Sequence, residues 1–192
     1  MAEKSTLTIP LPLDRDLFFA KQVDQESIEV LSKDIVKINE NDHFLEKYYT
    51  AFDLVYKRPP IKIYIDSYGG NVYQIFGVIN IIESSKTPIH TICTGTAMSC
   101  GFMLLISGHR RFAYKYSTPL YHQVSWEGIG GKIADTEQRM VEFKRMQDII
   151  EEMTLRKTKI TKKKLAQIYK EKVDWFMTSA EAKRLGVIDE IL

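Results

Sequence analysis

The chain has 192 residues, of which 44% are hydrophobic and 27% charged, and its formal net charge is +2. This length suits one domain with a sizeable core, and the balanced charge argues against a nucleic-acid or membrane-surface partner. Its two cysteines, Cys93 and Cys100, have no metal-ligand spacing, and we see no signal-like or membrane-length apolar run, so we expect a reduced, cytoplasmic protein.

The N-terminal third predicts a strand, a helix and an irregular segment. Residues 13–23 favour a short strand, and residues 25–39 carry apolar side chains at helical spacing. Segment 42–60 is aromatic and polar without a clear period, and it ends in two prolines. It fits an insertion or a partner surface, although packing of its aromatic residues in the core is the simpler interpretation.

From residue 61 the chain alternates between strands and helices. We expect strands at 61–66 and 89–94, and helices at 71–85 and 98–107. This alternation predicts parallel strands with right-handed crossovers, which bring the loops SYGG and GTAMS to the same carboxyl edge of the sheet. Sites in α/β proteins usually form at that edge.

The last part of the chain predicts shorter elements around two helices. Expected in order are strands at 111–115 and 120–123, helices at 132–157 and 162–170, a capping box at 178–181, a stop at Gly186 and a final strand within 187–192. The whole chain is predicted to be a single α/β domain.

Ser99 is the first candidate for chemistry. It follows a predicted strand and opens a helix, so its hydroxyl lies at a sharp turn beside free backbone N–H groups that favour negative charge. Small neighbours, Gly95, Ala97 and Gly101, leave room for a substrate backbone. Taken alone, a helix-capping serine is the simpler interpretation.

A nucleophilic serine needs a base, and His122, at a predicted strand end, is the best placed of the four histidines. The third member is a carboxylate that orients the imidazole. Asp174 is one option, and Asp66 and Asp189 also lie near predicted strand ends.

A second loop supplies hydrogen-bond donors. The N–H of Gly70 can form an oxyanion hole with the N–H of Cys100, the residue after the serine. A plain tight turn is the alternative interpretation of the Gly69-Gly70 pair.

Four ordered motifs resemble the Clp protease proteolytic subunits, a family of serine peptidases, from about Asp16 to Leu192. GTAMSCG resembles the family's G-x-A-x-S-x-G around the nucleophile, and YHQ its apolar-His-Gln segment carrying the base. DWFM followed by SAEAKRLGVID resembles the segment carrying the acid, and SYGG the oxyanion loop S-P-G-G, with Tyr68 in place of proline. By this resemblance Ser99, His122 and Asp174 are the triad.

The resemblance also implies the architecture and the partners. It implies the spiral crossover fold shared with crotonases, with a head at 16–131 and 173–192 and long handle helices at 132–172. It further implies a cytoplasmic homo-oligomer of seven-membered rings, stacked into a chamber, that cleaves unfolded polypeptides delivered by an ATP-driven unfoldase. No cofactor or metal is expected.

Two alternatives compete with the peptidase. A crotonase-type acyl-CoA enzyme uses the same paired N–H groups but does not explain a serine, a histidine and an aspartate in register. A catalytically silent ring subunit or scaffold does not explain an intact triad.

Segment 42–60 is also longer than the family's usual connection.

Overall fold

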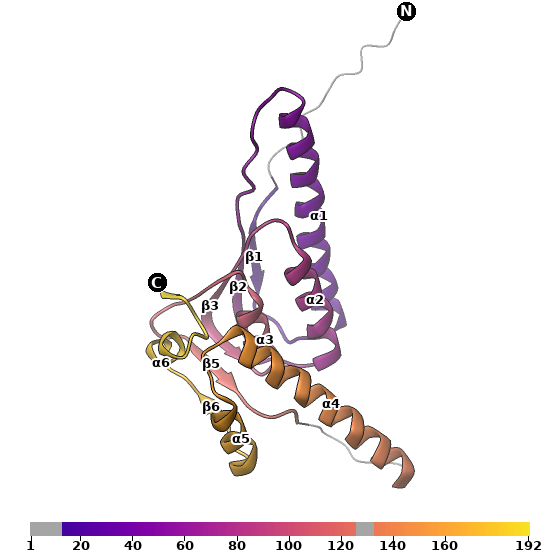
Figure 1. Ribbon diagram of the computed structural model, residues 1–192, viewed down its shortest axis with the longest axis vertical. Coiled ribbons are helices and arrows are strands. Elements are labelled where there is room, and N and C mark those ends of the chain that lie inside the picture. The colour runs from indigo at the N-terminus through magenta and orange to yellow at the C-terminus, as the bar shows by residue number, and fades with distance from the viewer. Residues whose placement is uncertain (1–12, 126–132) are drawn as a thin grey trace, which may run out of the picture.

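The computed structural model describes residues 13–125 and 133–192 (Figure 1). Residues 1–12 and 126–132, which include Lys132 at the start of the predicted handle, lie outside the described residues. The strands are β1 (Asp16–Phe19), β2 (Ile61–Ser67), β3 (Ile89–Met98), β4 (Arg110–Ala113), β5 (Thr118–Tyr121), β6 (Trp175–Phe176) and β7 (Glu190–Ile191). The helices are α1 (Gln25–Thr50), α2 (Val72–Ser84), α3 (Cys100–Ser107), α4 (Ile133–Lys157), α5 (Lys162–Glu171) and α6 (Ser179–Arg184).

The sheet confirms the predicted α/β fold. Its strand order is β1-β2-β3-β4-β7, and every pair along this path is parallel. β3 forks, because residues 90–93 pair with β4 whereas residues 96–98 pair with β5. β5 then pairs antiparallel with β6. This fork carries the end of β3 toward β5, and so brings the residues that follow both strands close together.

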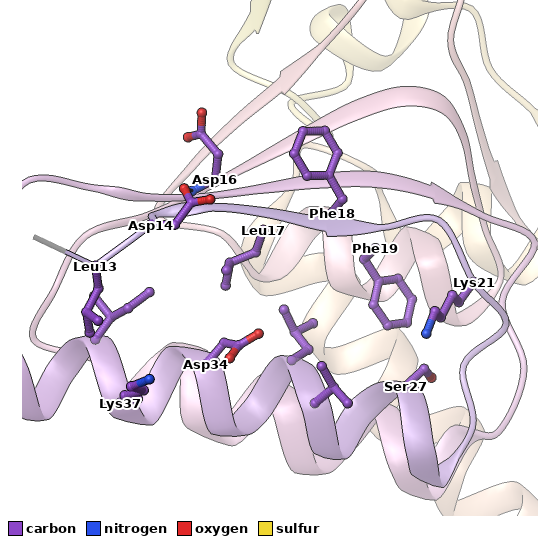
Figure 2. A pocket seen from close by; sticks show the side chains of 13 residues that line it. Leu13, Asp14, Asp16, Leu17, Phe18, Phe19, Lys21, Ser27, Asp34 and Lys37 are labelled. Atoms are coloured by element: carbon purple, nitrogen blue, oxygen red, sulfur yellow. Dashed lines mark hydrogen bonds between the residues drawn. The ribbon is translucent and has the colours of Figure 1, made fainter.

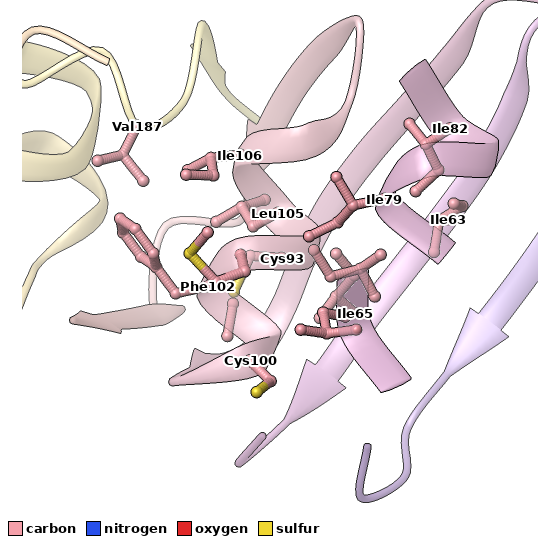
Figure 3. Close-up of a cluster of buried hydrophobic side chains, with 14 of the residues drawn as sticks. Ile63, Ile65, Ile79, Ile82, Cys93, Cys100, Phe102, Leu105, Ile106 and Val187 are labelled. Atoms are coloured by element: carbon pink, nitrogen blue, oxygen red, sulfur yellow. The ribbon is translucent and has the colours of Figure 1, made fainter. Parts of the chain in front are cut away.

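The core lies between the sheet and helices α1, α2 and α3. On β2, Ile63 and Ile65 are fully buried on the side that faces the helices, while Lys62 is exposed on the other. Every residue of α3 is buried, and Figure 3 shows its side chains beside those of β2 and α2. A helix buried on all sides fixes the position of its own first residue, which here is Cys100.

The opposite face of β1 and β2 is open in the single chain. Phe18 is 76% exposed and stacks on Tyr64, with ring centroids 4.9 Å apart. On the helix side of β1 there is a cavity of about 380 Å³. Figure 2 shows Leu17 and Phe19 pointing from β1 toward α1, with Asp34 of that helix also lining the space.

Segment 42–60 corrects two predictions. Residues 42–50 are not irregular but continue α1, and the rings of this segment pack on one another rather than in the core, with Phe44 46% and Phe52 62% exposed. The period is hidden because Asp42 occupies a buried helix position. Its carboxylate accepts hydrogen bonds from Arg15, from the Tyr56 hydroxyl and from Thr87. A polar group so fully satisfied can replace an apolar one inside the protein.

Helix α4 (Ile133–Lys157) confirms the long helix predicted at 132–157. Its C-terminal half packs on the body, where Met146, Ile150 and Met153 are buried. Met140 and Val141 are exposed, and Figure 1 shows this end of the helix running away from the sheet. Of the helices in the described part of the chain, none is both long and apolar enough to cross a bilayer.

Candidate functional site

Ser99 stands between the end of β3 and the first residue of α3 with an unusual backbone. Its φ is +55° and its ψ is −119°, a conformation that is rare for a residue other than glycine. Its N–H donates to the carbonyl of Leu120 at 3.1 Å, and its side chain makes no helix-capping hydrogen bond. The capping interpretation therefore fails, and the strained turn leaves the hydroxyl available for another role.

Two of the small residues around Ser99 have a packing role that the sequence did not indicate. A Cβ on Gly101 would lie 2.8 Å from the carbonyl oxygen of Ser67, and a Cβ on Gly95 would lie 2.6 Å from the carboxylate of Asp66. These two glycines make room for the end of β2, and room for a substrate backbone stays a prediction. The cause is the register, which pairs Ser67 with Ala97 and brings the two loops into direct contact.

Loop 67–70 packs closely on the Ser99 turn. Gly69 has a φ of +100°, and a Cβ there would lie 2.7 Å from the Cβ of Ser99. On the other side the loop is bonded to Val23, whose N–H donates to the Gly69 carbonyl at 2.8 Å. A plain tight turn therefore does not account for the glycine pair. Chain reversal needs glycine here, and so does the close approach of the loop to Ser99 and Val23.

Two backbone donors lie at the contact of these loops. Cys100 is the first residue of α3, so its N–H has no partner within the helix. The N–H of Gly70 has no hydrogen-bond partner among the described residues. Both residues line the pocket that holds Ser99. The structure thus brings the two predicted donors to one pocket, and their role as an oxyanion hole, which would stabilise negative charge on a substrate oxygen, stays a prediction.

His122 follows β5 and lines the same small pocket as Ser99, with a volume of about 50 Å³. The rest of the pocket mixes apolar and polar side chains. Val72, Met103, Val124 and Ile150 are apolar, and Tyr121, Gln123 and Ser125 are polar. No hydrogen bond joins the side chains of Ser99 and His122 in the part of the chain that the structure describes. The fold thus brings the predicted nucleophile and base to one pocket, but their side chains do not form a hydrogen bond in the described residues.

Asp174 approaches His122 through the sheet. The antiparallel pairing of β5 with β6 matches Tyr121 with Trp175, so the next position on each strand is His122 and Asp174, respectively. The Asp174 side chain is exposed, and within residues 13–125 and 133–192 no hydrogen bond connects it with His122. Strand pairing places the predicted acid at the position next to the base, without a hydrogen bond between their side chains in the described residues.

The rival carboxylates have other partners. Asp66 accepts from the N–H of Thr96 at 2.8 Å and from its hydroxyl at 3.0 Å. Asp189 forms an ion pair with Arg111 at 2.7 Å, at the far side of β4. Burial raises the pKa of Asp189, but hydrogen bonds and charge from Arg111 outweigh this and hold the pKa below its ordinary value. Each of these carboxylates has a structural role.

The other three histidines do not line the pocket of Ser99. His90 lies at the start of β3, at the opposite end of the strand from Ser99, where burial and then Arg110 lower its pKa. His109 accepts the N–H of Ile89 at 2.8 Å through Nδ1. His43 lies on α1.

Sequence reasoning missed one polar residue beside the pocket. Gln147 of α4 is buried, and its side-chain oxygen accepts the N–H of Val124 at 2.8 Å. Its amide nitrogen lies 3.4 Å from the Tyr121 hydroxyl and donates to Glu151 at 2.9 Å. Gln147 thereby anchors the segment that follows His122 to the handle helix. A lone glutamine within MQDII was the available signal, but the sequence does not show which strand it meets.

Comparison with known proteins supports the fold and the motifs. The family model described as Clp protease matches residues 7–192, and the chain belongs to this family. An ATP-dependent Clp protease proteolytic subunit of Borreliella afzelii is 33% identical over 134 residues, which cover 69% of this chain and 66% of that protein. The subunit of Deinococcus radiodurans is 32% identical, covering 69% and 64%, and subunit 1 of Rhodococcus jostii is 35% identical, covering 69% and 60%. The matched part of the chain thus spans about two thirds or less of the length of these relatives.

Proposed function

We propose that the protein is a serine endopeptidase of the Clp protease type. The observation that carries this proposal is the shared pocket, in which Ser99, strained at a helix start, lies with His122 and with the free N–H groups of Gly70 and Cys100. Membership of a family whose relatives are named proteolytic subunits supports it. No cofactor is needed for this chemistry.

In the proposed mechanism the Ser99 hydroxyl attacks the scissile carbonyl while His122 takes its proton. The carbonyl oxygen becomes an oxyanion held by the N–H groups of Gly70 and Cys100, and His122 then returns the proton to the leaving amine. Water hydrolyses the acyl-enzyme by the same route. Asp174 orients His122 once their side chains meet, a movement that the end of the short β5–β6 ladder permits because only two residue pairs hold it.

The apolar lining next to Ser99 supports cleavage after an apolar side chain. Val72, Met103 and Ile150 offer hydrocarbon and thioether surface to an apolar side chain. The polar side chains of the same pocket, Tyr121, Gln123 and Ser125, are uncharged and offer a charged side chain no opposite charge. We infer that the substrates are unfolded polypeptides presenting apolar residues, because such residues are buried in folded proteins.

The proposal includes assembly into seven-membered rings stacked face to face, served by an ATP-driven unfoldase in the cytoplasm. The outer end of α4 supports the assembly, since Met140 and Val141 are 57% and 72% exposed in the single chain. A contact there lies on the same helix as Gln147, which holds the segment after His122. Assembly can therefore bring His122 and Asp174 into register with Ser99.

A silent ring subunit is the second candidate, and one observation favours it. In the described residues of the single chain the triad side chains form no hydrogen bonds to one another. The two functions differ in covalent reactivity, since a silent subunit does not react with a serine-directed probe.

The test is labelling by a fluorophosphonate probe with mass spectrometry of the modified peptide. We expect covalent modification of Ser99, none in Ser99→Ala, and a fall in peptide hydrolysis by several powers of ten in both Ser99→Ala and His122→Ala. Asp174→Asn should cut turnover by about 10⁴ without lowering the melting temperature. Absence of labelling in the assembled wild-type protein would favour the silent subunit, and greater damage from Asp66→Asn or Asp189→Asn at unchanged stability would reassign the acid.

A further inference from the structure

The side chain of Cys100 makes a contact that the mechanism above does not use. Its sulfur lies 3.1 Å from the carbonyl oxygen of Gly70, across the junction between α3 and loop 67–70. A thiol is a weak hydrogen-bond donor, and this separation is short for a sulfur–oxygen pair. The sulfur of the other cysteine, Cys93, lies 3.9 Å from the carbonyl oxygen of Gly95, a much longer separation. The two buried cysteines therefore differ in the hydrogen bonds that they make.

The Cys100 thiol is in the right protonation state to donate. It is 2% exposed, and burial raises its pKa to about 11. At neutral pH the sulfur therefore carries its proton, which the Gly70 carbonyl is placed to accept. The same burial keeps solvent from competing for the bond.

The residues joined by this bond are the ones that carry the two candidate oxyanion donors. Cys100 supplies the first N–H from its own backbone, and its side chain holds the residue that supplies the second. Gly70 needs such support, because it follows Gly69 and both adopt positive φ, where a glycine has wide conformational freedom. On the side of β1, Val23 bonds the neighbouring residues Gly69 and Asn71. The thiol ties the loop from the side of Ser99.

We propose that Cys100 is a positioning residue whose thiol fixes the Gly70 N–H at the oxyanion hole. The inference rests on the proposed peptidase function and goes beyond the backbone role assigned to Cys100 above. Val23 holds the peptide of the Gly70 N–H through the Gly69 carbonyl, and it holds the next peptide through the Asn71 N–H. Without the thiol the Gly70 carbonyl loses its second anchor, so rotation about Gly70 can tilt the N–H away from the oxyanion. Since the oxyanion exists only after attack begins, this loss affects turnover more than substrate binding.

The experiment compares Cys100→Ala, Cys100→Ser and Cys93→Ala in the assembled protein. Cys100→Ala removes the donor, Cys100→Ser restores an O–H, and Cys93→Ala removes an equally buried thiol that does not touch Gly70. We expect Cys100→Ala to lower kcat about tenfold with KM within twofold, less than the 10²–10³ lost when an oxyanion donor is deleted outright. Cys100→Ser should recover most of the rate, and Cys93→Ala should stay within twofold of wild type.

A second readout does not depend on activity. Hydrogen exchange of the peptide spanning residues 67–72, followed by mass spectrometry, should speed up in Cys100→Ala and not in Cys93→Ala. Equal kcat in Cys100→Ala and wild type, or exchange that is no faster, overturns the inference while Ser99 labelling leaves the peptidase standing. An equal loss in Cys100→Ala and Cys100→Ser with a matching fall in melting temperature also overturns it, because it indicates packing alone. A wild-type protein that neither labels nor cleaves removes the peptidase function on which the positioning role depends.

Discussion

Gly69 offers a direct test of how closely the two loops must meet. In Gly69→Ala the new Cβ would lie 2.7 Å from both the Met98 carbonyl oxygen and the Ser99 Cβ, and 2.9 Å from the Cys100 nitrogen. These atoms belong to the backbone or to its first side-chain carbon, so a rotamer change cannot relieve the clash. An L-residue at positive φ costs about 1 to 2 kcal/mol, and overpacking adds about 1 to 3 kcal/mol.

We therefore expect Gly69→Ala to lower the free energy of unfolding by about 2 to 5 kcal/mol. At this chain length that corresponds to a melting temperature lower by roughly 5 to 15 °C. Displacing the loop by an ångström should also slow fluorophosphonate labelling of Ser99 about a hundredfold. Labelling is measured at 20 °C, well below the thermal unfolding of the wild-type and variant proteins. The melting temperature is measured by circular dichroism.

Gly77 provides the matched control. It lies on the exposed side of α2, where a new Cβ meets nothing within 4 Å. Gly77→Ala should raise the free energy of unfolding by about 0.5 to 1 kcal/mol, because alanine favours a helix, and should leave labelling unchanged. A Gly69→Ala protein with wild-type labelling rate and melting temperature would refute the reasoning about loop contact.

Two further predictions concern the charge network and the assembly. Burial raises the pKa of Asp42, but hydrogen bonds from Arg15 and two hydroxyls outweigh burial and bring the pKa below its ordinary 3.8. The ionised carboxylate therefore stabilises the fold fully above pH 3.8, and this stabilisation is lost as the pH falls through the pKa of the folded state. Asp42→Asn should lower the free energy of unfolding by about 3 kcal/mol at pH 7 and remove this acid dependence in a pH series of thermal melts. Glu29→Gln, which breaks only an exposed ion pair with Lys33 on α1, should have a far smaller effect on both. Phe143→Glu on α4 should shrink the particle in light scattering and reduce peptidase activity while circular dichroism stays unchanged, because a two-fold contact takes up the charge twice. A wild-type protein that is monomeric at micromolar concentration yet fully active would contradict this last expectation.

The sequence predicts the central fold well because the two-residue period of strands and the 3.6-residue period of helices are both strong there. Ile61, Ile63 and Ile65 alternate along β2, and the glycine-rich turns mark where each strand ends. Parallel pairing then follows from the alternation of strands and helices, and it correctly brings loops 67–70 and 95–99 to one edge. The division into head and handle helices stays a prediction.

The sequence fails where long-range contacts decide the structure. The helical continuation through residue 50 depends on Arg15, far away in the chain, neutralising Asp42. The role of Gly95 and Gly101 depends on which neighbour approaches them, and a pattern of small residues does not identify that neighbour. For the candidate site, local motifs indicate residue types. The position of Asp174 next to His122 depends on the pairing of β5 with β6, which the motifs do not encode.

The contact between loop 67–70 and the Ser99 turn affects how natural variation in related chains should be interpreted. Glycine at 69 and 101 is demanded by packing alone, so these positions would stay fixed in a lineage that had lost catalysis. The Asp174 side chain is exposed and carries no comparable packing duty, so in such a lineage it would drift freely. Among related chains, a retained aspartate at this position would therefore distinguish active subunits from inactive ones that keep only the fold, whereas retained glycines would not.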